Sequence, residues 1–419
     1  MKKILMILAL SIAVGGCGKY NEVTMHSIFK LTLASDVEMR DQTKAWVIVR
    51  DNGTSDLIDY KAIRPGESVG IETGKAISNG KIDVIYFTLG EASTLEISVF
   101  TAVDPGSEWN WKEPTYIGLP PPSSNDRAYF VDPSIFSSLY EPLISDQYGK
   151  LTDVSYDRIK VPIRSGVNRQ LLSCMTETDT PPFAIVPKYS WIKNLGDQDE
   201  VTITDSDLLE FDKVVPFNHP GSLIHRVYVQ GFDTLPAVGT RYFRYYGDSL
   251  SGFVITREFA YYETESIPLG FMKELPYYYL DLSSNGFAYK SFGPAPNTIN
   301  YVDPSKFQVN HEPPPSFSFT TNHEYVYYIT TFEFQGNRTV NLRFYGTADT
   351  PKYYQPLPDA LLNEYFFPFE NIPFVSAEFV TEDVSYADFL TRNKSASNGE
   401  LYDFDAPYLR ASVTVRKNE

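Results

Sequence analysis

Two short apolar stretches in the first quarter of the chain decide the fold class: Ile82-Asp83-Val84-Ile85-Tyr86-Phe87 and Leu95-Glu96-Ile97-Ser98-Val99-Phe100. Both have the length of a strand and are rich in β-branched and aromatic residues. Similar stretches lie at 28–33 and 46–49, and turn sequences such as Asp51-Asn52-Gly53 separate them. Several short strands divided by turns predict an all-β sandwich or barrel.

The composition of the whole chain agrees with a mainly β protein. The 419 residues include 30 tyrosines and 28 phenylalanines, which favour strands. The 29 prolines outnumber the 25 glycines, and this composition argues against a helical bundle or a coiled coil. The formal net charge of −17 excludes a general nucleic-acid binder, because such a protein needs a basic face.

Proline-rich tracts at 120–122 and 313–315 divide the sequence, because such tracts resist sheet pairing and act as semi-rigid spacers. We therefore expect two or three tandem β-sandwich modules, immunoglobulin-like or transthyretin-like, with a few short helices. The expected division is a signal peptide at 1–16, a tether at 17–25 and β-rich modules at 26–119, 120–312 and 313–419.

An internal repeat is one interpretation of two recurring motifs. Val131-Asp132-Pro133-Ser134 recurs as Val302-Asp303-Pro304-Ser305, and Asp179-Thr180-Pro181 recurs as Asp349-Thr350-Pro351 at nearly the same offset. Duplication and coincidence both remain open, because the two proline tracts do not follow that offset. Each Asp-Pro-Ser predicts a short helical turn, with Asp as its N-cap. Further short helices are expected at 359–366 and, from a capping box, at 385–392.

The N-terminus predicts export and lipid attachment. The positive Met1-Lys2-Lys3 precedes an apolar stretch at 4–14, which is too short to span a bilayer as a helix. The stretch ends in Val14-Gly15-Gly16-Cys17, which resembles the lipobox of bacterial lipoproteins. The resemblance implies cleavage after residue 16, lipidation of Cys17 and a membrane partner through that anchor. Cys174 is then the one remaining cysteine, and we expect a small buried hydrophobe.

Sequence motifs for catalysis are weak. Gly66-Glu67-Ser68-Val69-Gly70 has the form G-x-S-x-G, but no helical pattern follows it, which predicts a turn entering a strand. The five histidines, at 26, 219, 225, 311 and 323, do not have the spacing of a zinc site. We therefore expect a protein that is not an enzyme and has no cofactor, apart from a Ca²⁺ ion considered next.

An acidic cluster offers one candidate metal site. Asp197, Asp199, Asp205 and Asp207 provide hard oxygen ligands at short spacing, which could bind Ca²⁺ in a sandwich loop. The alternative, which we favour, is a solvated loop on an acidic protein.

Aromatic residues offer candidate ligand contacts. Trp109 and Trp111 lie on one face if the segment is extended, and so do Tyr277 and Tyr279. If exposed, such rings suit sugar stacking or protein recognition. The alternative, favoured for any single pair, is that they pack the sandwich cores.

Together, the lipobox, the acidic chain and the Tyr- and Phe-rich strands resemble surface lipoproteins of Bacteroidota, many of which have tandem β-sandwich modules. The resemblance implies an outer-membrane, lipid-anchored protein of the cell envelope, facing either the surface or the periplasm. We expect it to present β-modules for adhesion or for binding a glycan or another surface protein. A fimbrial subunit assembled by strand exchange is the alternative, and a glycan-acting hydrolase is a more distant one.

Overall fold

The computed structural model describes residues 24–35, 42–90, 94–111, 124–132, 139–153, 159–177, 185–193, 195, 200–219, 224–234, 241–242, 252–258, 266–284, 286–336, 338–347, 353–365, 367–392, 402–403 and 408–417. Strands dominate these residues, and the α-helices among them are short, so the predicted mainly β class is confirmed.

The N-terminal sandwich comprises residues 26–111. One of its sheets has the order β4-β1-β7, with β1 (His26–Leu33), β4 (Ser68–Thr73) and β7 (Ser107–Trp111). The facing strands are β2 (Gln42–Asp51), β3 (Leu57–Ile63), β5 (Ile82–Gly90) and β6 (Leu95–Val103). Apolar side chains from both layers meet in one core, among them Phe29, Val47 and Trp109. The sandwich predicted for the first module is therefore present.

The second sandwich comprises residues 124–210. Its five-stranded sheet, in the order β10-β9-β12-β13-β15, contains β9 (Leu139–Asp146), β10 (Gly149–Asp153), β12 (Arg169–Glu177), β13 (Ile185–Lys193) and β15 (Leu209–Glu210). Its three-stranded sheet, in the order β11-β8-β14, contains β8 (Ser124–Asp132), β11 (Ile159–Arg164) and β14 (Glu200–Thr202). Ile144, Leu172 and Val161 belong to the core that the two sheets share.

A twelve-stranded sheet, which we call the long sheet, joins the two sandwiches. Its order is β19-β17-β21-β22-β29-β27-β25-β26-β6-β5-β2-β3. The strands not yet introduced are β17 (Ile224–Phe232), β19 (Phe253–Glu258), β21 (Tyr277–Ser284), β22 (Phe287–Gly293), β25 (Tyr327–Gln335), β26 (Thr339–Gly346), β27 (Phe374–Glu382) and β29 (Tyr408–Arg416). The sheet is antiparallel except where β26 pairs with β6 in parallel.

The expected modules at 26–119, 120–312 and 313–419 each contribute four neighbouring strands to the long sheet. The four strands of the 313–419 module lie between those of the other two. Its strand β29 pairs with β22, and its strand β26 pairs with β6. The three modules therefore share one hydrogen-bonded sheet. Residues 120–312 also hold two parts, the second sandwich and the strands that follow residue 212.

Both faces of the long sheet are covered. On β2, Trp46 and Ile48 belong to the largest apolar cluster, whereas Val47 and Val49 point into the core of the N-terminal sandwich. The largest cluster is completed by the two-stranded sheet of β16 (Lys213–Asn218) and β20 (Ser266–Phe271) and by segments around Phe317 and Phe369. Two further small pairs are β18 (Arg241–Tyr242) with β28 (Tyr402–Asp403), and β23 (Phe307–Val309) with β24 (Phe319–Thr321).

The predicted short helices are present where the structure describes them. Helix α2 (Asp359–Glu364) and helix α3 (Tyr386–Arg392) match the expected segments. Ser385 and Asp388 form the predicted capping contacts, because the Asp388 N–H donates to Ser385 Oγ at 3.1 Å. Asp303 caps a 3₁₀ turn at Pro304–Lys306. The other copy of that motif, at 131–136, lies outside the described residues from residue 133 on, and both Asp-Thr-Pro copies lie outside them.

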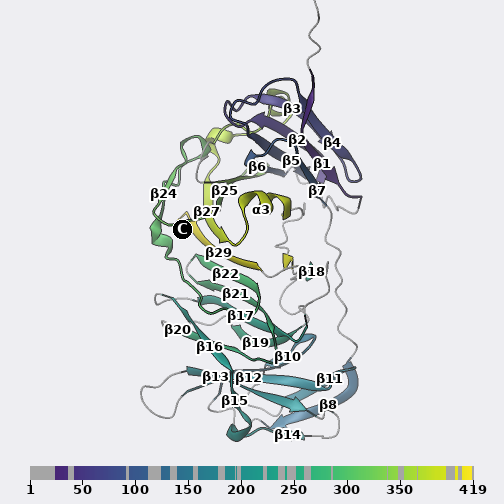
Figure 1. Ribbon diagram of the computed structural model, residues 1–419, viewed down its shortest axis with the longest axis vertical. Helices are drawn as coiled ribbons and strands as arrows, with labels where there is room; N and C mark the ends of the chain where they lie inside the picture. Colours follow the sequence, from purple (N-terminus) through teal and green to yellow (C-terminus); the bar gives the residue numbers. More distant parts are fainter. Residues whose placement is uncertain are drawn as a thin grey trace, which may run out of the picture.

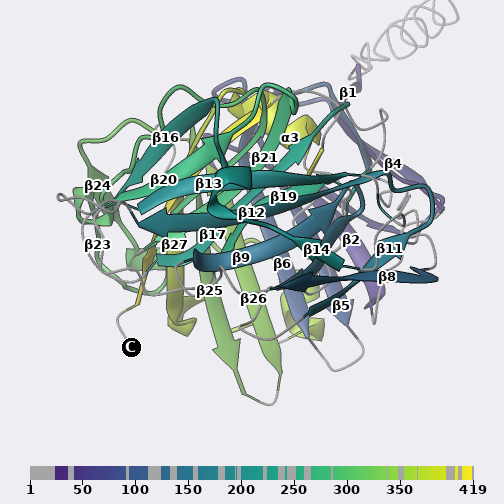
Figure 2. The same cartoon turned by 90° about the horizontal axis from the view of Figure 1, so that it is seen from below.

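The two sandwiches lie at opposite ends of the long axis, with the long sheet between them (Figure 1). Seen from below, the strands of the second sandwich run across those of the long sheet (Figure 2). In the part of the chain that the structure covers, no helix has the length and apolar character needed to span a membrane.

Candidate functional site

The two tryptophans of β7 are core residues. Trp109 is 2% exposed and Trp111 is 5% exposed. Trp109 meets Phe29 and Phe100 edge-on at centroid distances of 5.0 and 5.2 Å, and Trp111 meets Tyr86 at 4.5 Å. The two indoles share one face of the strand as predicted, and that face points into the sandwich, so they pack the core, as favoured for a single pair, and do not form the exposed stacking surface considered for Trp109 and Trp111.

The predicted tyrosine pair of β21 is also largely buried. Tyr279 is 1% exposed, and its hydroxyl donates to Asp281 Oδ2 at 3.3 Å. Tyr277 is half-buried beside Phe292, with ring centroids 6.5 Å apart. Tyr277 therefore keeps part of its surface open, whereas Tyr279 packs the sheet.

The candidate Ca²⁺ ligands are only partly placed. Asp197 and Asp199 lie outside the described residues, while Asp205 and Asp207 form a 3₁₀ turn. Hydrogen bonds from the Thr204 hydroxyl and N–H, both 2.7 Å long, lower the pKa of Asp207. This carboxylate therefore closes a turn. Among the described residues, no group of three or more His, Cys, Asp or Glu side chains is arranged to hold a metal ion.

The remaining sequence motifs have structural surroundings. Gly66 has φ +82° in the turn before β4, and Ser68 Oγ lies 2.9 Å from Thr32 Oγ1, as expected for a turn entering a strand. Cys174 is buried, and burial raises the pKa of its thiol to about 12, which fits the predicted hydrophobe. Cys17 lies outside the described residues.

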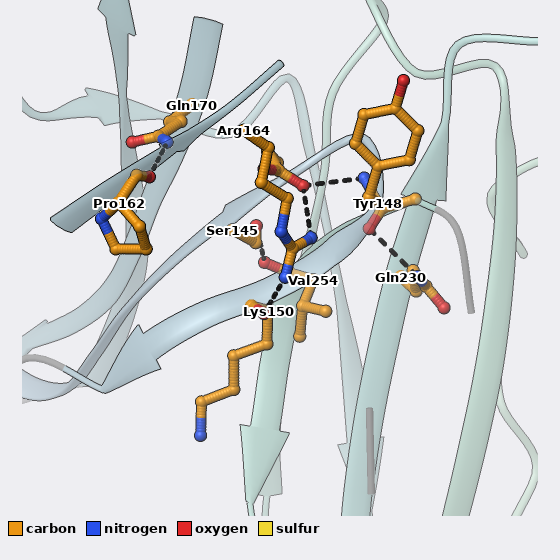
Figure 3. A network of polar contacts seen from close by, with 10 residues as sticks. Ser145, Tyr148, Lys150, Pro162, Arg164, Gln170, Gln230 and Val254 are labelled. Atoms are coloured by element: carbon orange, nitrogen blue, oxygen red, sulfur yellow. Dashed lines mark hydrogen bonds and ion pairs between the residues drawn. The ribbon is translucent and has the colours of Figure 1, made fainter. Parts of the chain in front are cut away.

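A buried polar network that sequence reasoning missed lies in the second sandwich (Figure 3). Asp146 is 0% exposed at the end of β9. Arg164 Nη1 on β11 approaches its Oδ1 at 3.0 Å, and the Tyr148 N–H donates to the same oxygen at 2.8 Å. Arg164 Nη2 also donates to the Lys150 carbonyl at 3.2 Å. The pair ties β9, β10 and β11 together.

Neighbouring contacts extend this network through the second sandwich and to the long sheet. The buried Tyr129 hydroxyl donates to Gln170 Oε1, and Gln170 Nε2 donates to the Pro162 carbonyl at 3.0 Å. Ser145 Oγ donates to the Val254 carbonyl of β19 at 2.9 Å. The second sandwich is thus fastened to the edge of the long sheet by a polar contact as well as by apolar packing.

Burial makes ionisation of Asp146 less favourable than it is in water. Burial raises the pKa of this carboxyl, and the opposing effect of Arg164 is smaller. One oxygen, Oδ2, has no hydrogen-bond partner. An acid without solvent contact, held by one arginine, is suited to fixing strands in place, because a general acid must reach its substrate.

A second polar cluster is a row of charged residues that crosses the long sheet. Asp281, Lys290, Arg410 and Glu382 lie directly opposite one another on β21, β22, β29 and β27. Arg410 contacts Glu378 at 3.0 Å and Glu382 at 3.3 Å. Burial raises the pKa of Glu382, despite its contact with Arg410 and a hydrogen bond from the Tyr327 hydroxyl. Arg410 and Glu382 are more than 90 positions from Asp281 and Lys290, so the strand register is what brings the two pairs together.

A third polar cluster closes the outer end of the N-terminal sandwich. Asp51 accepts hydrogen bonds from the N–H groups of Gly53, Thr54 and Ser78 at 2.8, 3.2 and 2.8 Å. Burial opposes ionisation of Asp51, but the hydrogen bonds from Ser78, Thr54 and Gly53 together lower its pKa. Asn52 then links the two loops, because Asn79 Nδ2 donates to its Oδ1 at 2.7 Å.

These clusters stabilise loops and strands and do not assemble a catalytic set among the described residues. The fold and the N-terminal motif therefore carry the functional argument. No protein-family model matches the chain, and no curated protein sequence is detectably similar to it.

Proposed function

We propose that the protein is a lipid-anchored envelope protein, not an enzyme, that holds a β-sandwich away from the membrane for adhesion or for binding a glycan or another protein. The N-terminal sequence up to Cys17 supports the anchor. The β-rich body offers sheet surfaces and loops that suit a binding or scaffolding role.

The observation that carries the proposal is the position of the two sandwiches. The N-terminal sandwich follows the anchor by a few residues, and the second sandwich lies at the opposite end of the long axis (Figure 1). The long sheet runs between them without a break in hydrogen bonding. A stiff body anchored at one end presents its far end outward.

The anchor is tested with Cys17→Ser in the producing bacterium. The wild-type protein should partition with detergent-phase membranes, incorporate labelled fatty acid and have the mass of a chain cleaved before Cys17 and lipidated there. The variant should lose the lipid label and the membrane partitioning. Unchanged partitioning and mass in the variant would refute the proposal.

The binding role is tested with the soluble body, residues 18–419, on a broad glycan array and against envelope proteins in a crosslinking pull-down. Recognition should depend on the second sandwich, so charge reversal at exposed Glu210 or Asp205 should weaken it more than the same change at exposed Glu67. Absence of any reproducible ligand on both platforms would count against recognition.

A fimbrial or structural subunit is the second candidate, and the position of β1 favours it. This first strand lies between β4 and β7 and buries Phe29, Leu31 and Leu33. Its loss would open an apolar strip that an incoming strand could fill. Limited proteolysis followed by size-exclusion chromatography decides between the two, because a subunit polymerises after cleavage and a display protein remains monomeric.

A further inference from the structure

The outer end of the N-terminal sandwich is formed by residues 24–27, 52–57, 74–81 and 104–106, which we call the N-terminal tip. The strand register places these segments together, because His26 pairs with Thr73 and Asp51 pairs with Ile82. The Gly106 N–H also donates to the Ile28 carbonyl at 2.7 Å. The tip lies at the end of the long axis that is away from the second sandwich (Figure 1).

The segment between Cys17 and the tip is short. Eight residues, 18–25, separate Cys17 from the first residue of β1. Fully extended, they reach at most about 30 Å. A compact body of this length has a radius of gyration of about 22 Å, so the tether is shorter than the body is wide. An anchor at Cys17 therefore keeps the tip near the bilayer.

The surface of the tip includes apolar side chains that water does not favour. Met25 is 55% exposed, the most among the large hydrophobic side chains described, and Leu57 is 38% exposed. Lys75 is exposed on the neighbouring loop. Exposed apolar side chains and a lysine at the same end of the sandwich match the boundary between acyl chains and phosphate groups.

Hydrogen bonds also hold the loops of the tip together. Asp51 fixes the backbone of the 52–54 loop and of Ser78, and the Asn52–Asn79 contact joins the loops directly. Asn52 Nδ2 also donates to Asp83 Oδ1 at 2.6 Å. A stiff end transmits its orientation to the body, whereas loose loops would let the body tilt freely.

From the tether length and this surface, we propose that the N-terminal tip rests on the phospholipid bilayer, with Met25 and Leu57 at the acyl boundary and Lys75 among the headgroup phosphates. The long axis then stands away from the membrane. This inference rests on the lipid anchor proposed above and adds the surface that contacts the membrane.

The test compares two exposed leucines at opposite ends, Leu57 and Leu209, which are 38% and 49% exposed. Each is replaced by Cys in the full lipidated protein and labelled with an environment-sensitive dye. Cys174 is buried with a thiol pKa of about 12, and Cys17 carries the lipid, so the label goes to the new site. The labelled proteins are reconstituted in vesicles of phosphatidylethanolamine and phosphatidylglycerol, with spin-labelled headgroups as quencher.

The dye at position 57 should be quenched at least threefold more than the dye at position 209, and Met25→Ser should reduce its blue shift. Equal quenching at both positions, or stronger quenching at 209, in a protein shown by mass to be lipidated would overturn the inference and leave the anchor intact. Absence of the lipid from the wild-type protein would instead refute the proposed function. Circular dichroism of each variant confirms that the fold is kept.

Discussion

The N-terminal sandwich fills its core with Trp109 and Trp111 against Phe29 and Tyr86, whereas the second sandwich buries Asp146 with Arg164 beside Tyr129 and Gln170. Both sandwiches contain clusters of polar contacts, but in different places. In the first they lie at the rim, around Asp51, and in the second they lie inside, around Asp146. The core of the first is therefore apolar and its titratable contacts lie at the rim, whereas the second buries a charge pair beside its apolar core. Two modules of one architecture should thus respond differently to mutation and to acid.

The largest expected effect is in the aromatic core. Trp109→Ala removes a ring that contacts both layers, and large aromatic truncations cost about 4 kcal/mol of unfolding free energy. Urea unfolding followed by circular dichroism measures the loss. Leu57→Ala, at an exposed site, is the control and should change the free energy by less than about 0.5 kcal/mol. Similar losses for the two variants would mean that Trp109 does not hold the core.

The next largest loss of unfolding free energy is expected from breaking the Asp146–Arg164 pair. Arg164→Ala leaves the Asp146 carboxylate without its cation, which costs about 3 kcal/mol near neutral pH. The measurement is the same urea titration. Asp146→Asn keeps an acceptor for Arg164 and carries no charge to bury, so its cost should be clearly smaller.

The pH dependence of Arg164→Ala sharpens this result. Because burial already raises the pKa of Asp146, the folded state binds this proton more readily than the unfolded state. The contribution of Asp146 is thus most favourable below its ordinary pKa and is lost as the pH rises through the raised value. The penalty of Arg164→Ala should shrink on acidification, and a penalty independent of pH would contradict the assignment.

The contribution of Asp51 to stability should depend on pH in the opposite direction. Its pKa is lowered in the folded state, so its contribution is present above the ordinary pKa and is lost as the pH falls through the lowered value. Asp51→Ala leaves three backbone N–H groups without their acceptor and should cost about 2 kcal/mol at neutral pH. The cost, measured by urea unfolding, should decrease in acid only near the lowered pKa of Asp51.

The smallest effect is expected at the acidic turn of the second sandwich. Asp207→Ala removes the two contacts to Thr204 and should cost about 1 kcal/mol by thermal unfolding. Asp205→Ala, on the same turn, is the matched control. A Ca²⁺-dependent rise in stability that both variants abolish would instead support the metal site considered from the sequence.

Local structure followed from local sequence. The strands at 82–87 and 95–100, the capping box at Ser385 and the Asp303 turn depend on neighbouring residues, and each is present. The order of the long sheet did not follow, because the parallel pairing of β26 with β6 joins residues more than 200 positions apart. Alternation along a strand also leaves its inward face undetermined, which is why the sequence places Trp109 and Trp111 on one face but leaves both core packing and ligand contact open.

The polar clusters were harder to foresee for the same reason. Asp146 and Arg164 are 18 positions apart on strands of different sheets, and Asp281, Lys290, Arg410 and Glu382 meet only through register. A charged residue inside an otherwise apolar strand, such as Asp83 in β5, is the signal that could have pointed to buried polar contacts. The candidate Cys17 needed no such information, because its motif is contiguous.

The place of β29 in the long sheet bears on how the chain can mature. This strand is the last part of the sheet to be synthesised, yet it lies in the middle, between β22 and β27. Until it emerges, the sheet exists as two unjoined halves. The two halves can therefore join only after residues 408–416 have been made, and until then β22 and β27 each leave one strand edge without its partner.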